Sequence, residues 1–175
     1  MGNFIETSLP GVYYRKLKPF IDHRGTYLNL WTKHGVDFFT GTWMEDDISI
    51  SEQYVLRGLH GDNRTWKLIC CPFGEIYVVV VDNNKDSKHY KKWLSFDIGE
   101  RNPIQLLIKP KFGLGHLVLS NKAAFFYKQS QLYSGMENQF TLRWNDPSLS
   151  IIWPIDSPIL SNRDKNAPFI LDYNV

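Results

Sequence analysis

With 175 residues, 43% of them hydrophobic and 22% charged, the chain suits one globular domain over residues 1–175 and is not of the disordered class. A formal net charge of +2 argues against the strongly basic character of a nucleic-acid-binding protein, and no apolar run approaches the ~18 residues of a membrane span. Aromatic residues make up 15% of the chain and favour strands over helices.

The first third of the chain predicts short strands separated by turns. A strand is expected over residues 11–18, a turn over 22–25, and alternating strands over 26–31 and 47–51. Residues 35–44 have a weak pattern that fits a short helix or a loop. The N-terminal third is therefore expected to be mostly β structure.

The stretch from Tyr54 to Asp82 predicts three strands, over residues 54–57, 68–71 and 75–81. Polar side chains lie among these apolar strands, and they are costly to bury without a role. We therefore expect them to contribute to a functional site. These residues are Arg57, His60, Asp62 and Lys67.

The rest of the chain continues the same pattern. Strands are expected over residues 92–98, 104–108, 116–120, 123–129, 140–144 and 151–153, with a Gly/Pro loop over 110–115. Ser161 is a plausible N-cap of a short helix. Roughly ten short strands with turn residues between them predict an all-β sandwich or barrel with a few short helices, and a jelly roll suits this size.

The two cysteines, Cys70 and Cys71, are adjacent. Neighbouring residues of a strand point to opposite faces, so a disulfide between them would be strained. We expect two reduced core thiols in a cytoplasmic protein.

Taken singly, the candidate site residues also have ordinary structural explanations. His60 near a strand end is more often structural than catalytic. Arg57 suits a phosphate or carboxylate, but it also suits an ion pair with Glu45, Asp46 or Asp47. Lys67 either extends to solvent or steadies a developing oxyanion.

Three further residues have the same ambiguity. His116 is either a second site histidine or a loop residue. Tyr127 and Tyr133, six residues apart, face the same way if one strand holds both, although a turn near Ser130 would prevent this. Asp164, taken alone, fits a helix-capping role.

Metal binding is an alternative, because the cavities of β-sandwiches and barrels often hold metals. The best available donor set is His60 and Asp62 with Glu75 and His116. The chain has no H-x-H pair and no C-x-x-C motif, so no metal site is expected.

Several motifs, in one order along the chain, together resemble the dTDP-4-dehydrorhamnose 3,5-epimerase family, over residues 20–168. The resemblance implies a cupin-type jelly roll, a homodimer that shares N-terminal strands, and neither a metal nor an organic cofactor. The motifs are VLRGLH (55–60), KL (67–68), GEIYVVVVD (74–82), a tyrosine pair at 127 and 133, WNDP (144–147), IIWP (151–154) and ILSNRD (159–164).

The resemblance also implies roles for four catalytic residues. His60 matches the base that removes a proton beside a keto group, and Asp164 matches the carboxylate that holds this histidine. Lys67 matches the lysine near the keto oxygen. Tyr127 matches the acid that returns a proton on the opposite face. This is the apparatus that inversion through an enolate requires.

Matches to the family's substrate contacts are more numerous. Tyr133 matches a tyrosine beside the sugar, and Arg24 and Arg57 match arginines that contact the nucleotide diphosphate. Asn29 and Asp47 stand where the family usually has an acidic residue and an asparagine. The remaining matches are Ser49, Ser51 and His116.

The chain departs from the family where it reads RGLHGD in place of RGLHYQ, with three fewer residues before Lys67. In this it looks like the branch that acts on GDP-6-deoxy-4-keto-heptoses in capsule synthesis. The predicted substrate is therefore a GDP- or dTDP-linked 4-keto-6-deoxy sugar, inverted at C3 or at C3 and C5. The alternatives are a 3,4-ketoisomerase and a metal-dependent, sugar-binding cupin.

Overall fold

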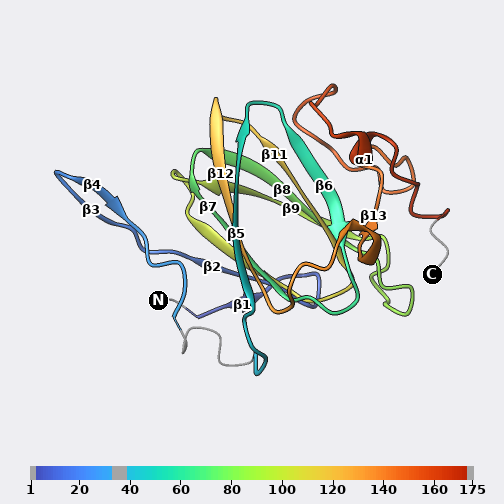
Figure 1. The fold of residues 1–175 in the computed structure, drawn as a ribbon, viewed down its shortest axis with the longest axis horizontal. Coiled ribbons are helices and arrows are strands. Elements are labelled where there is room, and N and C mark those ends of the chain that lie inside the picture. Colours follow the sequence, from blue (N-terminus) through green and yellow to red (C-terminus); the bar gives the residue numbers. More distant parts are fainter. Residues whose placement is uncertain (1–2, 33–38, 173–175) are drawn as a thin grey trace.

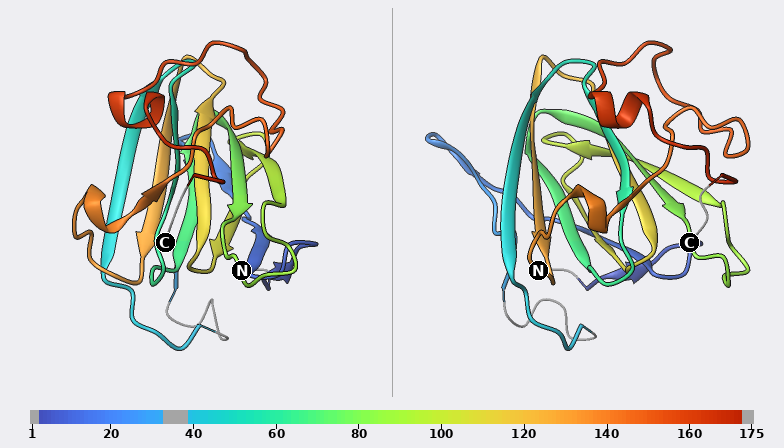
Figure 2. Two further views of the ribbon diagram at one scale, coloured as in Figure 1. Left: turned by 90° about the vertical axis from the view of Figure 1, so that its right-hand side faces the viewer. Right: turned by 45° about the vertical axis from the view of Figure 1, so that its right-hand side comes forward.

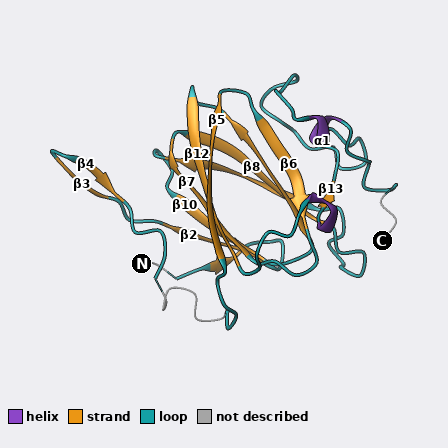
Figure 3. Ribbon diagram, in the orientation of Figure 1, coloured by secondary structure: helices purple, strands orange, loops and turns teal. Residues whose placement is uncertain are grey.

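The computed structural model describes residues 3–32 and 39–172, and strands dominate it (Figure 1). Figure 3 shows how few helical turns accompany them: the 3₁₀ turn η1 (Met136–Asn138) and the helix α1 (Asn162–Lys165). The all-β expectation is confirmed. Within the described residues, no helix has both the length and the apolar character that crossing a membrane requires.

Two antiparallel sheets form the body. The strands of the six-stranded sheet are, in spatial order, β1 (Ile5–Glu6), β2 (Val12–Lys16), β10 (Ile104–Ile108), β7 (Lys67–Phe73), β12 (Lys122–Gln129) and β5 (Glu45–Glu52). The strands of the five-stranded sheet are β13 (Phe140–Thr141), β6 (Leu56–Gly61), β11 (Phe112–Val118), β8 (Glu75–Asp82) and β9 (Trp93–Gly99).

A separate hairpin, β3 (Phe20–Asp22) with β4 (Gly25–Tyr27), projects away from the two sheets (Figure 1). At the other side of the molecule, the C-terminal segment runs over the five-stranded sheet, and α1 lies beside the end of β6 (Figure 2). This segment contributes to the site described below.

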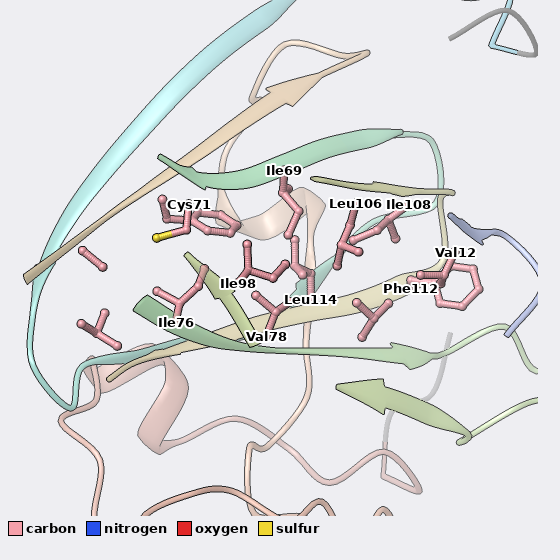
Figure 4. Close-up of a cluster of buried hydrophobic side chains, with 14 of the residues drawn as sticks. Val12, Ile69, Cys71, Ile76, Val78, Ile98, Leu106, Ile108, Phe112 and Leu114 are labelled. Carbon is pink, nitrogen blue, oxygen red and sulfur yellow. The ribbon is translucent and has the colours of Figure 1, made fainter. Parts of the chain in front are cut away.

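The main core lies between the two sheets. Ile69 and Leu106 of the six-stranded sheet meet Val78 and Ile98 of the five-stranded sheet, and all four side chains are buried (Figure 4). Burying such side chains stabilises the fold by about 1.5–3 kcal/mol each. This core holds the sheets together over the part of the sandwich that the pocket does not occupy.

Strand β8 has an unbroken apolar run because both of its faces are buried. Val78 and Val80 face the main core, whereas Val79 and Val81 face a second core under the C-terminal segment. A strand buried on both faces needs apolar residues at every position and not at alternate ones. The same arrangement ties the C-terminal segment to the sheet.

Most predicted strands are confirmed, and the errors have identifiable causes. Residues 28–31 leave the sheet after β4, because the Leu30 carbonyl accepts from the Gln105 side chain and not from a strand. Residues 151–153 form no strand either. There the Ile152 carbonyl accepts from Tyr77 Oη, and the Trp153 indole donates to a backbone carbonyl.

Two further expectations need correction. The supposed loop over 110–115 is mostly strand β11, which begins at Phe112. Residues 39–44 form neither helix nor strand, and residues 35–38 lie outside the described part of the chain. Cys70 and Cys71 are buried and free, as expected.

Candidate active site

A pocket of about 540 Å³ opens between the two sheets. Its size suits a small-molecule ligand. One wall comes from β6, β11 and the segment that leads into α1, and the other comes from β5, β12 and β7. Predicted site residues on both walls line this pocket: Asp47, Ser49, Arg57, His60, Lys67, His116, Tyr127, Tyr133 and Asp164.

His60 and Asp164 form a close polar contact in the pocket. His60 Nε2 lies 2.5 Å from Asp164 Oδ1, although the two residues are 104 positions apart in the chain. A ring that donates from Nε2 leaves Nδ1 as its proton acceptor. The pair therefore has the form of an oriented histidine base.

Asp164 is held firmly from the helix side. Ser161 caps α1 by accepting from the Asp164 backbone N–H, and its hydroxyl donates to Asp164 Oδ2 at 2.9 Å. Burial alone would raise the pKa of Asp164, but hydrogen bonds from His60, Ser161 and the Gly58 N–H outweigh it and hold the pKa below its usual value. Asp164 is thus a buried carboxylate at neutral pH. The capping role expected for Asp164 is wrong, because Ser161 is the N-cap of α1.

The pKa of His60 is set by opposing effects. Burial lowers it, the nearby charges of Arg163 and Lys67 lower it further, and Asp164 raises it. The balance leaves the pKa of His60 below the usual histidine value. His60 is therefore neutral at physiological pH and able to accept a proton.

Arg57 and His60 share the pocket because strand β6 is irregular. In a regular strand, residues three apart face opposite sides. Here the register between β6 and β11 shifts between the pairs Leu114–His60 and His116–Arg57. Gly58 permits this close approach, since a Cβ there would lie 2.4 Å from the Gly115 Cα.

Arg57 forms no ion pair with the acidic residues of β5 in the described structure. Its Nε donates instead to Ser51 Oγ at 3.0 Å. Ser51 is buried behind the pocket and positions the guanidinium. Arg57 thus keeps donors available for an anionic ligand.

Tyr127 lies on the opposite wall, in the middle of β12. Its pKa is raised by burial first and then by Asp47 and Glu45, so the phenol keeps its proton at neutral pH. Strand β12 ends at Gln129, so Tyr133 does not share a strand with Tyr127. Both side chains nevertheless line the pocket.

Lys67 begins β7 and is buried at the pocket, so of its two alternatives the extension to solvent is excluded. Burial lowers its pKa, and the charge of Asp62 partly offsets this. Lys67 lies opposite Gln129 of β12, which also lines the pocket. A buried amine here is placed to meet a developing negative charge.

His116 and Ser49 present polar atoms that lack partners. Among the described residues, His116 Nε2 and Ser49 Oγ are buried without a hydrogen bond. The His116 ring stacks on Phe125 at 4.1 Å between centroids, and burial, followed by the charge of Arg57, lowers its pKa to about 3. A buried unpaired polar atom is costly, which makes both atoms candidates for contact with a ligand.

Three predicted residues do not line this pocket: Ser51, which lies behind it, Arg24 and Asn29. Arg24 lies in the projecting hairpin, 75% exposed, with its guanidinium paired to Asp22 at 2.6 Å. Asn29 is exposed on the segment after β4. Neither Arg24 nor Asn29 reaches the pocket within one copy of the chain.

The structure also adds residues that the sequence did not single out as site residues. Gln129, Gln139 and Arg163 line the pocket, and Arg163 donates to Thr141 Oγ1 and Gln139 Oε1. Glu45 joins them from β5. The even spacing of Gln129 from Tyr127, and of Glu45 from Asp47, was the available signal.

Asp62 and Glu75, two of the candidate metal ligands, have structural roles outside this pocket. Asp62 Oδ1 accepts from the N–H groups of Arg64 and Thr65, so this residue shapes the short turn before Lys67. Glu75 lies elsewhere, with its carboxylate at Arg101. Within residues 3–32 and 39–172, no three His, Cys, Asp or Glu side chains are grouped as metal ligands.

Comparison with known proteins identifies relatives of this chain in sequence and in fold. The sequence profile described as dTDP-4-dehydrorhamnose 3,5-epimerase matches residues 6–172. The Shigella flexneri dTDP-4-dehydrorhamnose 3,5-epimerase is 35% identical over 176 residues, which cover 97% of each chain.

Solved structures agree. The dTDP-6-deoxy-D-glucose-3,5-epimerase RmlC of Legionella pneumophila, in complex with dTDP-4-keto-L-rhamnose, matches with a TM-score of 0.91 and 29% identity, over 98% of this chain and 94% of that one. The 3'-monoepimerase ChmJ of Streptomyces bikiniensis, in complex with dTDP-quinovose, matches with a TM-score of 0.87 and 25% identity, over 95% and 87%.

Proposed function

Because this chain belongs to the dTDP-4-dehydrorhamnose 3,5-epimerase family, it is an isomerase of nucleotide-linked deoxysugars, and we propose that His60 and Tyr127 carry its proton transfers. A ketone at C4 acidifies the neighbouring C–H bonds of the sugar. His60 removes one of these protons and leaves an enolate. Tyr127 then delivers a proton to the other face, which inverts the centre.

The supporting observation is that the base and the acid come from different sheets. His60 and its partner Asp164 lie on the wall built by β6 and α1, whereas Tyr127 lies on the wall built by β12. A sugar ring held between the walls presents one face to each. This favours epimerisation over 3,4-ketoisomerisation, which moves the carbonyl and requires no acid on the opposite face.

Lys67 and Arg57 supply charge at two places in this scheme. Lys67, buried beside the reacting centre, stabilises negative charge on the C4 oxygen of the enolate. Arg57 binds the diphosphate. Ser49 and His116 also line the pocket and offer polar atoms to the same ligand. Neutral His116 donates or accepts a hydrogen bond without adding charge.

Incubation of a nucleotide-linked 4-keto-6-deoxy sugar with the protein in heavy water tests the proposal. One deuterium in the product means inversion at C3 alone, and two mean inversion at C3 and C5. Intact, unlabelled substrate after long incubation contradicts the proposed function. Carbon-13 NMR of the product reports whether the carbonyl has moved.

Two variants assign the roles of the base and the acid. His60→Ala is expected to abolish deuterium exchange, because it removes the imidazole that Asp164 orients in the pocket. Tyr127→Phe is expected to slow inversion by about 10²- to 10⁴-fold while exchange at the His60 face continues. His89→Ala, on the β8–β9 connection outside the pocket, is the control. Normal exchange by His60→Ala would remove the role given to His60.

The nucleotide is proposed on two different grounds. The named relatives that were solved with ligands hold dTDP compounds, which supports dTDP for this chain. The RGLHGD motif supports GDP as a second candidate. A thermal-shift panel of dTDP, GDP, UDP and CDP separates them, since the nucleotide that binds the folded chain raises its melting temperature.

We also propose that two copies associate through the projecting hairpin. Phe20 and Ile21 of β3 are 61% and 70% exposed, which is unfavourable for apolar side chains that stay in water. Contact with a second copy would bury them and carry Arg24 toward the partner's pocket. Analytical ultracentrifugation of the wild type and of Phe20→Asp with Ile21→Asp tests this, with a monomer expected for the double variant.

The free, buried cysteines support a reducing compartment, and we propose the cytoplasm. Fractionation of the source cells, followed by detection with an antibody against the chain, tests this.

A further inference from the structure

Strand β5 presents two carboxyl groups to the pocket from one face. Glu45 and Asp47 are two residues apart and both line the pocket, whereas Asp46 between them points to the outer face and pairs with Lys128 at 2.6 Å. This alternation follows from the strand pleat. Within the described residues, neither Glu45 nor Asp47 forms an ion pair.

The strand register places this carboxyl pair beside the proposed acid. Asp47 lies directly opposite Tyr127 across the β5–β12 ladder, and Glu45 lies opposite Gln129. The Cβ atoms of directly opposite residues are about 4.5–5.5 Å apart, so their side chains are in contact range. Gln129 Nε2 donates to Asp47 Oδ2 at 3.2 Å and orients that carboxyl group beside Tyr127.

The two carboxyl groups also interact with each other. The pKa of Asp47 is raised by burial first and then by its neighbour Glu45, through both charge and a hydrogen bond between the side chains. Two close carboxylates cannot both ionise freely, so the pair retains one proton at a pH where an isolated carboxyl group has lost it. The main-chain N–H of Tyr133 donates to Glu45 Oε2 and orients this carboxyl group.

We propose that Glu45 and Asp47 share one proton and pass it to Tyr127 after each inversion, as a relay between solvent and the acid. This rests on the proposed function. When Tyr127 gives its proton to carbon, it becomes a phenolate. The carboxyl O–H bond then breaks as the phenol O–H bond forms. Protonated His60 releases to solvent the proton that it took from carbon, and solvent returns a proton to the carboxylate pair. The transfer is favourable because a carboxylic acid is far more acidic than a phenol.

Charged and titratable groups on the elements around Glu45 and Asp47 line the same pocket. The two tyrosines among these groups carry no positive charge. The cations that line the pocket lie on other strands and on the C-terminal segment. The groups are Tyr127 on β12, Tyr133 after it, Lys67 on β7, Arg57 and His60 on β6, His116 on β11, and Arg163 with Asp164 on α1.

Asp47→Asn and Glu45→Gln test the relay, with Asp46→Asn as the matched control on the outer face of the same strand. For Asp47→Asn, inversion is expected to slow roughly 10- to 100-fold, while deuterium exchange at the His60 face stays within about twofold of the wild type. Inversion by the wild type is expected to weaken relative to exchange as the pH rises and the pair loses its proton. The Asp47→Asn variant is expected to show no such pH dependence.

A higher KM with unchanged kcat and an unchanged pH profile would overturn the relay, because it would give Asp47 a binding role only. A carbon-13 NMR titration of the carboxyl groups needs no substrate. The relay requires the pKa of Asp47 to lie above its usual value in the wild type and to fall in Glu45→Gln, which removes the neighbouring charge. Two normal titrations in the wild type would overturn it, even where the enzyme epimerises. Absence of exchange by the wild type counts against the proposed function instead.

Discussion

The two walls of the pocket are held in place by different kinds of interaction. The wall of the proposed base depends on side-chain hydrogen bonds that join His60 to Asp164 across 104 positions of the chain. The wall of the proposed acid depends on strand register, which sets Asp47 beside Tyr127 through the β5–β12 ladder. A wall built by register follows from strand alternation, whereas a wall built by side chains needs one particular packing of a distant segment.

The wall of the base should therefore be the more sensitive to a single polar change. Asp164→Asn keeps the shape of the side chain but removes the charge that stabilises protonated His60. We expect kcat to fall about 10³- to 10⁴-fold. Steady-state kinetics measure this, with Asp156→Asn on the exposed part of the C-terminal segment as control. A fall below tenfold would mean that Asp164 is only a structural partner.

The wall of the proposed acid also contains a charged residue, Lys67 on β7, whose substitution should lower activity. Lys67→Met is expected to lower kcat about 10²- to 10³-fold, because the enolate oxygen loses its positive partner. Lys128→Met is the control, since Lys128 belongs to the neighbouring strand but pairs with Asp46 on the outer face. Equal kinetics for the two variants would show that Lys67 does not meet the reacting centre.

His116, on β11 in the same wall as His60, should make the fold sensitive to acid. Its folded pKa of about 3 lies below the ordinary value of 6.5, so the unfolded chain takes up a proton first as the pH falls. The free energy of unfolding should therefore decrease below pH 6.5 and level off near pH 3. Between pH 7 and pH 5, the wild type should lose roughly 2 kcal/mol more than His116→Phe.

Urea denaturation at the two pH values measures this difference. Carboxyl groups that titrate in both proteins cancel in the comparison, so only the change at His116 remains. Parallel losses of stability in the wild type and in His116→Phe would show that the folded ring is protonated as readily as the unfolded one.

The smallest expected effect concerns the cap that supports the base. Ser161→Ala removes the acceptor for the Asp164 N–H and the hydroxyl that donates to its carboxylate. We expect a loss of ~1 kcal/mol in the free energy of unfolding. Chemical denaturation measures it, and Ser150→Ala, on an exposed turn of the same C-terminal region, is the control. No difference between these variants would place the support of Asp164 elsewhere.

Local patterns predicted the acid wall better than the base wall. The strand over residues 123–129 was evident, and its alternation placed Tyr127 and Gln129 on one face. The residues alone suggested only a cap for Asp164, and its role beside His60 came from resemblance to a family. Arg57 and His60 share the pocket through a register shift at Gly58 that strand periodicity does not predict.

The sequence by itself determined the class of the fold, the state of the cysteines and the strand faces, because each depends on a period of two residues and on burial. The tertiary structure alone decided which faces meet. It placed His60 against Asp164, hid Ser51 behind Arg57 and set the pair Glu45 and Asp47 beside Tyr127. Such contacts depend on sheet order and on the path of long connections, and no local period records either.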